Sequence, residues 1–267
     1  MAGSIKTQLI MSLLLAASLS GCGVAPYSDS GPPRGSVDVS HIPNATPKDE
    51  PRSRYGNPKS YVVRGKRYYV QSTSQGHVER GIASWYGNKF HGRRTSSGET
   101  YDMYGMTAAH KTLPLPTYAR VTNLENGRSI VVKINDRGPF HNNRVIDLSY
   151  TAASKLDILK KGTGMVEVVA LNGRQPAPPE PRQIRAAGKT PGLYIQIGAF
   201  SNRYNADRLA SRLANSLDRS IRVKQSYSNS SEIFRVQVGP LLNVEQADSL
   251  TEKLAQLGIS DLHVIID

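Results

Sequence analysis

Alternating apolar and polar residues mark five short runs between residues 81 and 171, separated by turn signals such as Asn126-Gly127. The runs are 82–86, 118–123, 130–135, 144–148 and 166–170, and β-branched or aromatic residues are frequent in them. A period of two is typical of half-buried strands, because successive side chains point to opposite faces. Residues 150–159 instead have helical spacing. About six short strands with one helix favour a small closed barrel. Two more β-rich runs around Gly65 predict a hairpin over 61–70, so the first domain is predicted to span 61–171.

A second domain is predicted at 192–267, after a Pro-rich stretch that we expect to be an extended linker over 172–191. Its pattern gives strands at 193–197, 221–225, 233–238 and 263–266, and amphipathic helices at 205–217 and 244–257. The order is therefore βαββαβ, as in ferredoxin-like or RNP-like α+β sandwiches. The two halves also repeat one another, since each has a strand ending in Gly-Ala-Phe or Gly-Pro-Leu before a helix with Ala-x-x-Leu.

In this second domain, alternation divides the strand residues between two faces of the sheet. The apolar positions, predicted to lie against the helices, are Leu193, Ile195, Ile197, Phe234, Val236 and Val238. The polar positions, predicted to lie on an open face, are Tyr194, Gln196, Arg235 and Gln237. These four are candidates for binding an extended ligand, although a solvated sheet face is the plain alternative.

The first 60 residues carry no folding pattern but do carry a targeting pattern. Lys6 precedes an apolar run over 9–19 that is too short to span a bilayer and resembles a secretory signal. The only cysteine, Cys22, follows small residues where cleavage is expected, as in a bacterial lipoprotein signal, so we expect a signal peptide over 1–21 and lipid on Cys22. Gly23 behind the cysteine implies the outer membrane, facing the periplasm. Residues 22–60 are expected to be a disordered tether.

The net charge of +13 belongs mainly to the barrel domain, which has 16 Lys and Arg against 8 Asp and Glu, whereas 192–267 has 8 against 8. A basic surface indicates an anionic partner. Export argues against nucleic acid, and leaves lipid head-groups or a polymer that bears carboxylates.

Candidate chemistry gathers between residues 95 and 138. Asp136 follows the run 130–135 and precedes Arg-Gly-Pro, so it stands where a strand stops, a position that scaffolds often use for functional groups. Glu99 and His110 belong to the same stretch. Each has an alternative: Asp136 as a turn former, Glu99 as a solvated loop acid, and His110 as a structural histidine.

The motifs Gly-Ile-Ala-Ser-Trp-Tyr-Gly, Ser-Gly-Glu-Thr-Tyr-Asp-Met, Thr-Ala-Ala-His, Asn-Asp-Arg-Gly-Pro-Phe and Val-Ile-Asp-Leu-Ser lie within residues 81–171. This stretch resembles the six-stranded double-psi β-barrel of the rare lipoprotein A family, and residues 192–267 resemble its SPOR domain, a peptidoglycan-binding module. The resemblance implies a lytic transglycosylase, which cleaves between N-acetylmuramic acid and N-acetylglucosamine in denuded glycan at the division septum and leaves a 1,6-anhydro end. Related barrels include hydrolases and non-hydrolytic expansins, so the fold alone does not fix the reaction. Ser96 departs from the family, where Ala is more usual.

Matching positions in that family imply that Asp136, Glu99 and His110 form the functional set. We assign Asp136 to proton transfer, Glu99 to orientation or charge stabilisation, and His110 to a hydrogen bond with a carboxylate or a sugar hydroxyl. An acid in this role requires a pKa above the usual carboxyl value of about 4, which burial or a second carboxylate can supply.

Several further residues are candidates for substrate contact. Arg137 could hold the lactyl carboxylate of muramic acid or pair with Asp147. Trp85, Tyr86 and Tyr101 could stack on sugar rings, or be plain core. The histidines His77, His91, His110 and His141 lack the spacing of metal ligands, so neither a metal nor another cofactor is expected.

Two other functions remain open from the sequence. One is a glycan-binding scaffold lipoprotein without activity, since the same fold works without cutting bonds. The other is hydrolysis with Glu99 and Asp136 as an acid and base pair. Divisome proteins are possible partners in either case.

Overall fold

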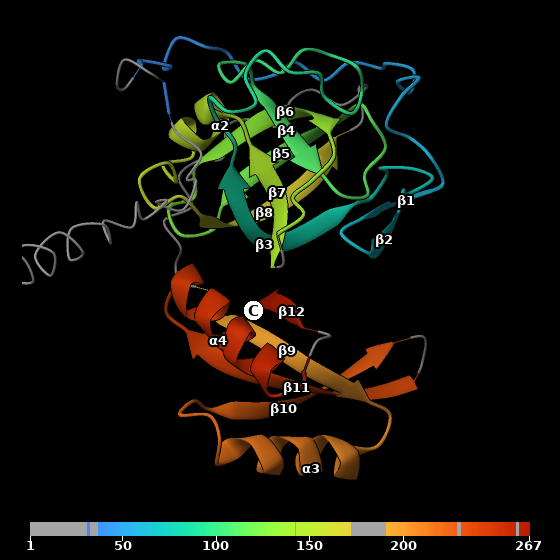
Figure 1. The fold of residues 1–267 in the computed structure, drawn as a ribbon, viewed down its shortest axis with the longest axis vertical. Helices are drawn as coiled ribbons and strands as arrows, with labels where there is room; N and C mark the ends of the chain where they lie inside the picture. The colour runs from blue at the N-terminus through green and yellow to red at the C-terminus, as the bar shows by residue number, and fades with distance from the viewer. Residues whose placement is uncertain (1–30, 33–36, 142, 172–190, 229–230, 260–261) are drawn as a thin grey trace, which may run out of the picture.

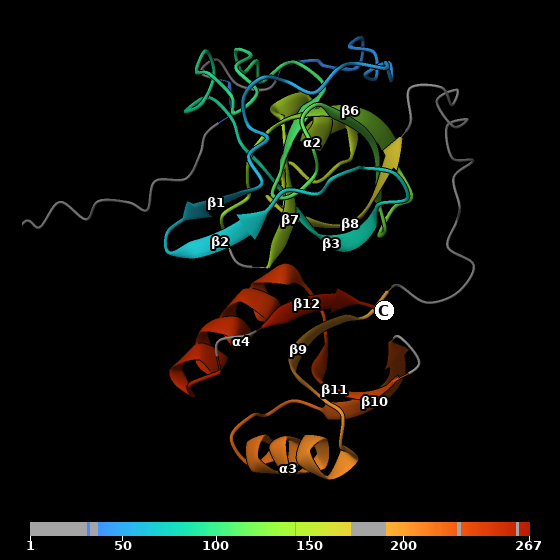
Figure 2. The ribbon, with the colours of Figure 1, turned by 90° about the vertical axis from the view of Figure 1, so that its right-hand side faces the viewer.

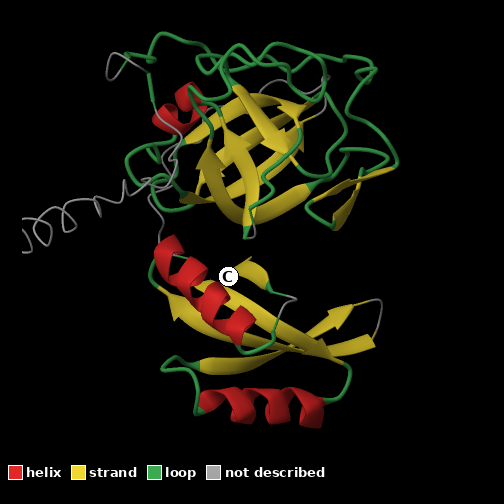
Figure 3. Cartoon of the chain, in the orientation of Figure 1, coloured by secondary structure: helices red, strands yellow, loops and turns green. Residues whose placement is uncertain are grey.

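The computed structural model describes residues 31–32, 37–141, 143–171, 191–228, 231–259 and 262–267. The signal sequence, Cys22 and nearly all of the Pro-rich linker lie outside these ranges. Within them, no helix has the length and apolar character needed to cross a bilayer. Figures 1 and 2 show the barrel and the second domain as separate layers of one molecule, and Figure 3 shows strands at the centre of the barrel, surrounded by loops, and a sheet with two helices in the second domain.

Six strands close the barrel in the order β3-β7-β4-β6-β5-β8. The pairs β3/β7 and β4/β6 are parallel and the other pairs are antiparallel. The strand bounds are Val78–Trp85 (β3), Thr107–His110 (β4), Thr117–Asn123 (β5), Ser129–Asp136 (β6), Arg144–Leu148 (β7) and Gly164–Leu171 (β8). Small and branched side chains from all six strands fill the interior, among them Ala83, Ala108, Ala119, Val132, Ile146 and Val168, each 0% exposed. This filling leaves no pore, and functional groups have to lie at the strand ends.

The barrel confirms the predicted fold, with two differences in detail. Strand β4 was not among the predicted runs, because Thr-Ala-Ala-His has neither alternation nor β-branched apolar residues. Helix α2 spans only Tyr150–Lys155, since Leu156 caps it and Asp157 has a positive φ of 60°. The hairpin of β1 (Ser60–Val63) and β2 (Lys66–Tyr69) forms as predicted.

Residues 37–59 differ from the expected disordered tether, because they pack along the barrel. Val39 is 5% exposed, and the Ala45 N–H donates to the Val131 carbonyl at 3.0 Å. Asn57 accepts from the Leu115 N–H at 2.8 Å, and Glu50 lies 3.0 Å from the Lys133 ammonium. The apolar residues here are too widely spaced to give a periodic signal, so the sequence did not reveal the contact.

The second domain has the predicted βαββαβ order. Its elements are β9 (Leu193–Phe200), α3 (Arg203–Ala214), β10 (Ile221–Ser228), β11 (Ser231–Leu241), α4 (Val244–Gln256) and β12 (His263–Ile266). The sheet order is β10-β11-β9-β12, and all six apolar positions predicted to face the helices are buried. The two domains touch: Ile82 of β3 and Met165 of β8 pack in the same apolar cluster as Leu193, and the Asn143 amide donates to Thr251 Oγ1 at 2.8 Å.

Candidate active site

Asp136 is the last residue of β6, and one of its carboxylate oxygens is fully engaged by the protein. Oδ1 accepts hydrogen bonds from the Ser96 N–H at 2.8 Å, from the Ser96 hydroxyl at 2.6 Å and from the Arg137 N–H at 2.7 Å. Among the residues that the structure describes, no donor contacts Oδ2. The side chain is half-buried. The scaffold therefore fixes the carboxyl group through one oxygen and leaves the other for chemistry.

A tight turn over residues 95–99 brings Glu99 to the same strand end. The Thr95 N–H donates to the Glu99 carbonyl at 2.8 Å, and the Ser97 N–H donates to the Asn135 carbonyl at 3.2 Å. Gly98 has a φ of 93°, a conformation that costs a residue with a side chain free energy, which explains Gly before Glu here. The turn thus joins Asp136, held by Ser96, to Glu99 at its other end.

Both carboxylate oxygens of Glu99 have partners from β6. Oε2 accepts from the Asn135 amide at 2.7 Å, and Oε1 lies 2.9 Å from the Lys133 ammonium. Lys133 also contacts Glu50. Burial opposes the charge of Lys133, but its bonds to Glu99 and Glu50 outweigh burial and raise the pKa of this ammonium. Glu99 is therefore a paired anion whose position is set by the strand that carries Asp136. Sequence reasoning missed Lys133, Asn135 and Glu50, of which Lys133 and Asn135 were visible as polar positions of the 130–135 run.

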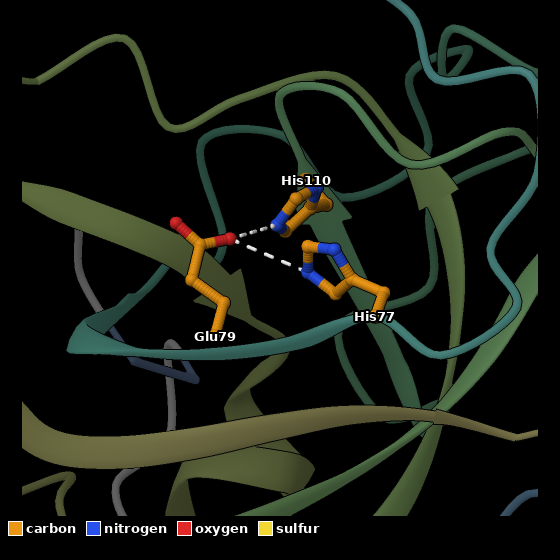
Figure 4. A group of neighbouring side chains, drawn as sticks. All are labelled: His77, Glu79 and His110. Atoms are coloured by element: carbon orange, nitrogen blue, oxygen red, sulfur yellow. Dashed lines mark hydrogen bonds and ion pairs between the residues drawn. The ribbon is translucent and has the colours of Figure 1, made fainter. Parts of the chain in front are cut away.

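His110 is 2% exposed and faces Glu79, not Asp136. Its Nε2 lies 3.0 Å from Glu79 Oε2, while Nδ1 accepts from the N–H groups of Thr112 at 3.2 Å and Leu113 at 3.1 Å. The partner carboxylate expected for His110 is thus Glu79, which the sequence analysis did not single out. His77 completes the group from the segment before β3, with its Nε2 3.4 Å from the same oxygen (Figure 4).

The ligand atoms of His77, Glu79 and His110 all lie within 4.8 Å of one another, close enough to hold a metal ion. The hydrogen bonds argue against that use. Because Nδ1 of His110 accepts from two backbone N–H groups, the ring proton belongs on Nε2, the atom that would have to bind the metal. A proton on Nδ1 would face the N–H groups of Thr112 and Leu113, and both of these hydrogen bonds would be lost. The group fits a carboxylate held by two imidazoles better than a metal centre.

This arrangement predicts a pH-dependent effect of Glu79→Gln on stability. Burial alone would raise the pKa of Glu79, but the hydrogen bond from His110 and the close His77 imidazole lower it from 4.5 to about 2. A lowered carboxyl pKa stabilises the fold above the unfolded value and loses that contribution as pH falls from about 4.5 to about 2. Because the carboxylate is 38% exposed, water screens it, and we expect a loss of about 1–2 kcal/mol at pH 7.

Urea denaturation of both proteins between pH 7 and pH 3 measures the difference. It should shrink steadily toward pH 3. A difference independent of pH would mean that shape and not charge matters at this position.

Arg137 neither pairs with Asp147 nor lies free to bind a ligand carboxylate, which corrects both expectations for it. Its Nε and Nη2 donate to the Gly56 carbonyl at 2.8 and 2.6 Å, and its Nη1 donates to the carbonyls of His110 at 3.2 Å and Leu113 at 2.5 Å. Burial lowers the pKa of this guanidinium. Arg137 joins the segment before β1 to the loop after β4, directly beside Asp136.

Asp147 of β7 instead accepts from the Ser84 hydroxyl. Ala109 of β4 lies between it and Asp136, opposite Asp147 in one ladder and opposite Asp136 in the other. Burial raises the pKa of the Asp147 carboxyl. The same barrel face therefore carries a second acidic side chain, which is half-buried and separated from Asp136 by strand β4.

The three aromatic candidates are not equivalent. Tyr101 and Tyr86, 2% and 8% exposed, stack on each other with ring centroids 4.1 Å apart, and the Tyr101 hydroxyl donates to the Tyr86 carbonyl at 2.5 Å. In this structure both are core residues and neither offers an open face to a sugar. Trp85 is only half-buried and packs edge-on against Tyr150, so it retains some exposed surface.

The four candidates on the second domain line one face, which is more enclosed than expected. Gln196 and Gln237 are 7% and 2% exposed. The Arg235 Nη1 donates to Gln196 Oε1 at 3.3 Å, and Arg222 Nε donates to Gln237 Oε1 at 2.9 Å. The Arg222 guanidinium also covers the Tyr194 ring at 3.5 Å from its centroid. Arg222 and Lys224 were not among the predicted residues, although the alternation of 221–225 places them on this face.

Two family models match the chain. Residues 78–168 match a lytic transglycolase model and residues 189–264 match the SPOR domain model. An endolytic peptidoglycan transglycosylase RlpA of Vibrio cholerae is 40% identical over 254 residues, covering 95% of this chain and 94% of that protein. A protein of the same name from Pseudomonas aeruginosa is 38% identical over 298 residues, covering 91% and 86%.

Among solved structures, the SPOR domain of Pseudomonas aeruginosa RlpA matches with 21% identity and a TM-score of 0.27, covering 28% of this chain and all of that one. The sequence relatives are much more similar and extend over both domains and the segments around them. They confirm the family that the motifs indicated: the chain belongs to the RlpA family of endolytic peptidoglycan transglycosylases.

Proposed function

We propose that the barrel cleaves the β-1,4 bond between N-acetylmuramic acid and N-acetylglucosamine in denuded glycan strands, with formation of a 1,6-anhydro end. The observation that carries the proposal is the strand end itself: in a chain of this family, one short turn fixes both Asp136 and Glu99 at the end of β6.

Asp136 is the proposed proton carrier, through Oδ2. In the first step the protonated carboxyl gives its proton to the bridging oxygen, the bond from that oxygen to C1 of muramic acid breaks, and positive charge develops on the sugar ring. In the second step the carboxylate takes the proton of the C6 hydroxyl, whose oxygen bonds to C1. The proton returns to Asp136 and no water is consumed, so one side chain acts first as acid and then as base.

Glu99 is proposed to stabilise the positive charge on the ring. Its two oxygens already contact the Asn135 amide and the Lys133 ammonium, which fixes the side chain in place and suits charge stabilisation better than proton transfer. His110 is proposed as a positioning residue. Its ring holds the start of the loop after β4, and its carbonyl accepts from the guanidinium of Arg137, the residue next to Asp136.

The second domain is proposed to bind the same denuded strands, which would raise their local concentration around the barrel. Lipid on Cys22 would place the protein at the outer membrane, facing the periplasm, with enrichment at the division septum where denuded glycan is produced. The basic barrel suits a polymer that bears carboxylates. Divisome proteins are further proposed partners.

The test is purified protein acting on sacculi treated with an amidase, with mass spectrometry of the new chain ends. Anhydro ends support the proposal. Reducing ends, heavier by one water, would instead favour hydrolysis by Glu99 and Asp136. Binding without any released fragment would favour the scaffold function.

A further inference from the structure

The face of the second domain that carries Tyr194, Gln196 and Gln237 also carries an excess of positive charge. Arg222 and Lys224 lie on β10, and Arg235 lies directly opposite Lys224 on β11. Residues opposite one another in an antiparallel pair share a face, so the three cations are neighbours. Like charges in this arrangement repel each other unless an anion lies among them.

That anion is Asp267, which comes from the other edge of the sheet. Its Oδ2 lies 2.6 Å from Arg222 Nη2, and both carboxylate oxygens lie 2.7 Å from Lys224 Nζ. Among the described residues, Asp267 is the only carboxylate that contacts any of the three cations. The hydrogen bonds from Lys224 and Arg222 lower the pKa of its carboxyl, so Asp267 remains ionised at neutral pH.

The contact is long-range within the sheet. Strand β12 is one edge of the order β10-β11-β9-β12, and Asp267 extends it by pairing with Gly192, with N–H to carbonyl distances of 2.8 and 3.0 Å. Lys224 and Arg222 belong to the opposite edge. The two edges can meet only because the sheet curls, as Figure 2 shows. Gln237 is paired with both Arg222 and Gln196 in the sheet, so the two buried amides share the face of these cations.

We propose that Arg222 and Lys224 form a carboxylate subsite for the lactyl group of N-acetylmuramic acid, and that Asp267 occupies this subsite until glycan displaces it. Two donors converging on both oxygens of one carboxylate form the recognition geometry that such a ligand group needs. The buried amides of Gln196 and Gln237 line the adjoining surface and suit sugar hydroxyls.

Displacement is feasible because the ion pairs are partly open to solvent. The side chains of Arg222, Lys224 and Asp267 are 35%, 44% and 36% exposed. Exposed pairs of this kind contribute little to stability, so a second carboxylate can replace Asp267 without loss of the fold. The Arg222 guanidinium can stay on the Tyr194 ring during the exchange, since the ring and the carboxylate use different parts of it.

This inference rests on the proposed glycan binding by the second domain. It is tested with the full chain carrying Asp136→Asn, so that the ligand stays intact, by titration with denuded glycan fragments and with the same fragments after reduction of their lactyl carboxyl groups. Asp267→Asn should tighten binding of the unreduced fragments on the order of three- to tenfold and leave the reduced fragments unaffected. Lys224→Gln should weaken binding of the unreduced fragments only.

Glu232→Gln is the matched control, because it makes the same change in net charge on β11 at a residue that contacts Gln225 rather than these cations. It should leave both affinities unchanged. Equal gains for Asp267→Asn and Glu232→Gln, or a gain that persists with reduced fragments, would overturn the carboxylate subsite. If the parent chain binds neither ligand, the proposed glycan binding itself fails, and that outcome is distinct from the other two.

Discussion

Asp136→Asn is expected to abolish formation of 1,6-anhydro ends while glycan binding persists. Asn keeps an oxygen that can accept the three hydrogen bonds now made to Oδ1, so the strand end retains its shape. What disappears is the group able to give and take a proton. General acid and base catalysis contributes about 10² to 10⁴ in rate, and because Asp136 serves in both steps, we expect a loss near the upper value.

The measurement is the release of anhydro ends from denuded sacculi per unit time, together with the affinity for the same material. Asp102→Asn provides the control, since Asp102 is an exposed acid whose contacts are the Tyr104 N–H and His91. It should retain full activity. Cleavage by the Asp136 variant at more than about a tenth of the normal rate would mean that another group carries the proton, with half-buried Asp147, whose carboxyl pKa is raised, as the next candidate.

Arg137→Met is expected to lower the free energy of unfolding by about 2–4 kcal/mol, because it removes the hydrogen bonds from the guanidinium to three carbonyl groups. The guanidinium now donates to Gly56 from one side and to His110 and Leu113 from the other. Met fills similar volume but offers no donor. Arg137→Lys should recover only part of the loss, since one ammonium cannot reproduce the planar fork that reaches both segments.

Urea denaturation measures both variants, and Arg128→Met is their control. Arg128 forms an exposed ion pair with Asp157, whose oxygen lies 3.8 Å from the guanidinium. Its replacement should therefore change the free energy of unfolding by less than about 0.5 kcal/mol. Activity gives a second comparison. The Met variant should lose activity at temperatures where it is still folded, because Arg137 also supplies one of the N–H groups on Asp136 from a loop that its side chain anchors. Full activity and stability in the Met variant would show that water replaces the guanidinium at these carbonyls.

The elements that the sequence predicted well are those with an internal pattern. Alternation located most of the strands and the buried face of β9 and β11, where all six predicted apolar residues lie inside. It missed β4, whose Thr-Ala-Ala-His becomes a strand only because β6 and β7 pair with it on both sides. Residues 37–59 were missed for a related reason, since their few apolar contacts depend on a barrel surface made by distant residues.

The candidate site was predicted in part. The identity and location of Asp136 and Glu99 followed from motifs and from a strand that stops at Asp136. Their partners did not, because Ser96, Lys133 and Asn135 carry meaning only once the 95–99 turn is folded against β6. For Arg137 and His110 the residue type suggested ligand binding, but both are engaged within the protein. Arg137 donates to backbone carbonyls, and His110 contacts Glu79.

The packing of residues 37–59 along the barrel would also limit the reach of the enzyme if Cys22 carries lipid. The length of chain between lipid and barrel would then run not from Cys22 to Ser60 but only from Cys22 to Gly31, where an added Cβ would meet the Tyr150 ring at 3.5 Å; the Val37 N–H also donates to the Tyr150 hydroxyl, at 3.4 Å. At about 3.5 Å per residue, the nine residues 22–30 span at most roughly 30 Å, against about 130 Å for residues 22–59. Inserting residues before Gly31 should therefore let the protein cleave wall material farther from the bilayer, whereas equal cleavage depth with every insert length would exclude this limit.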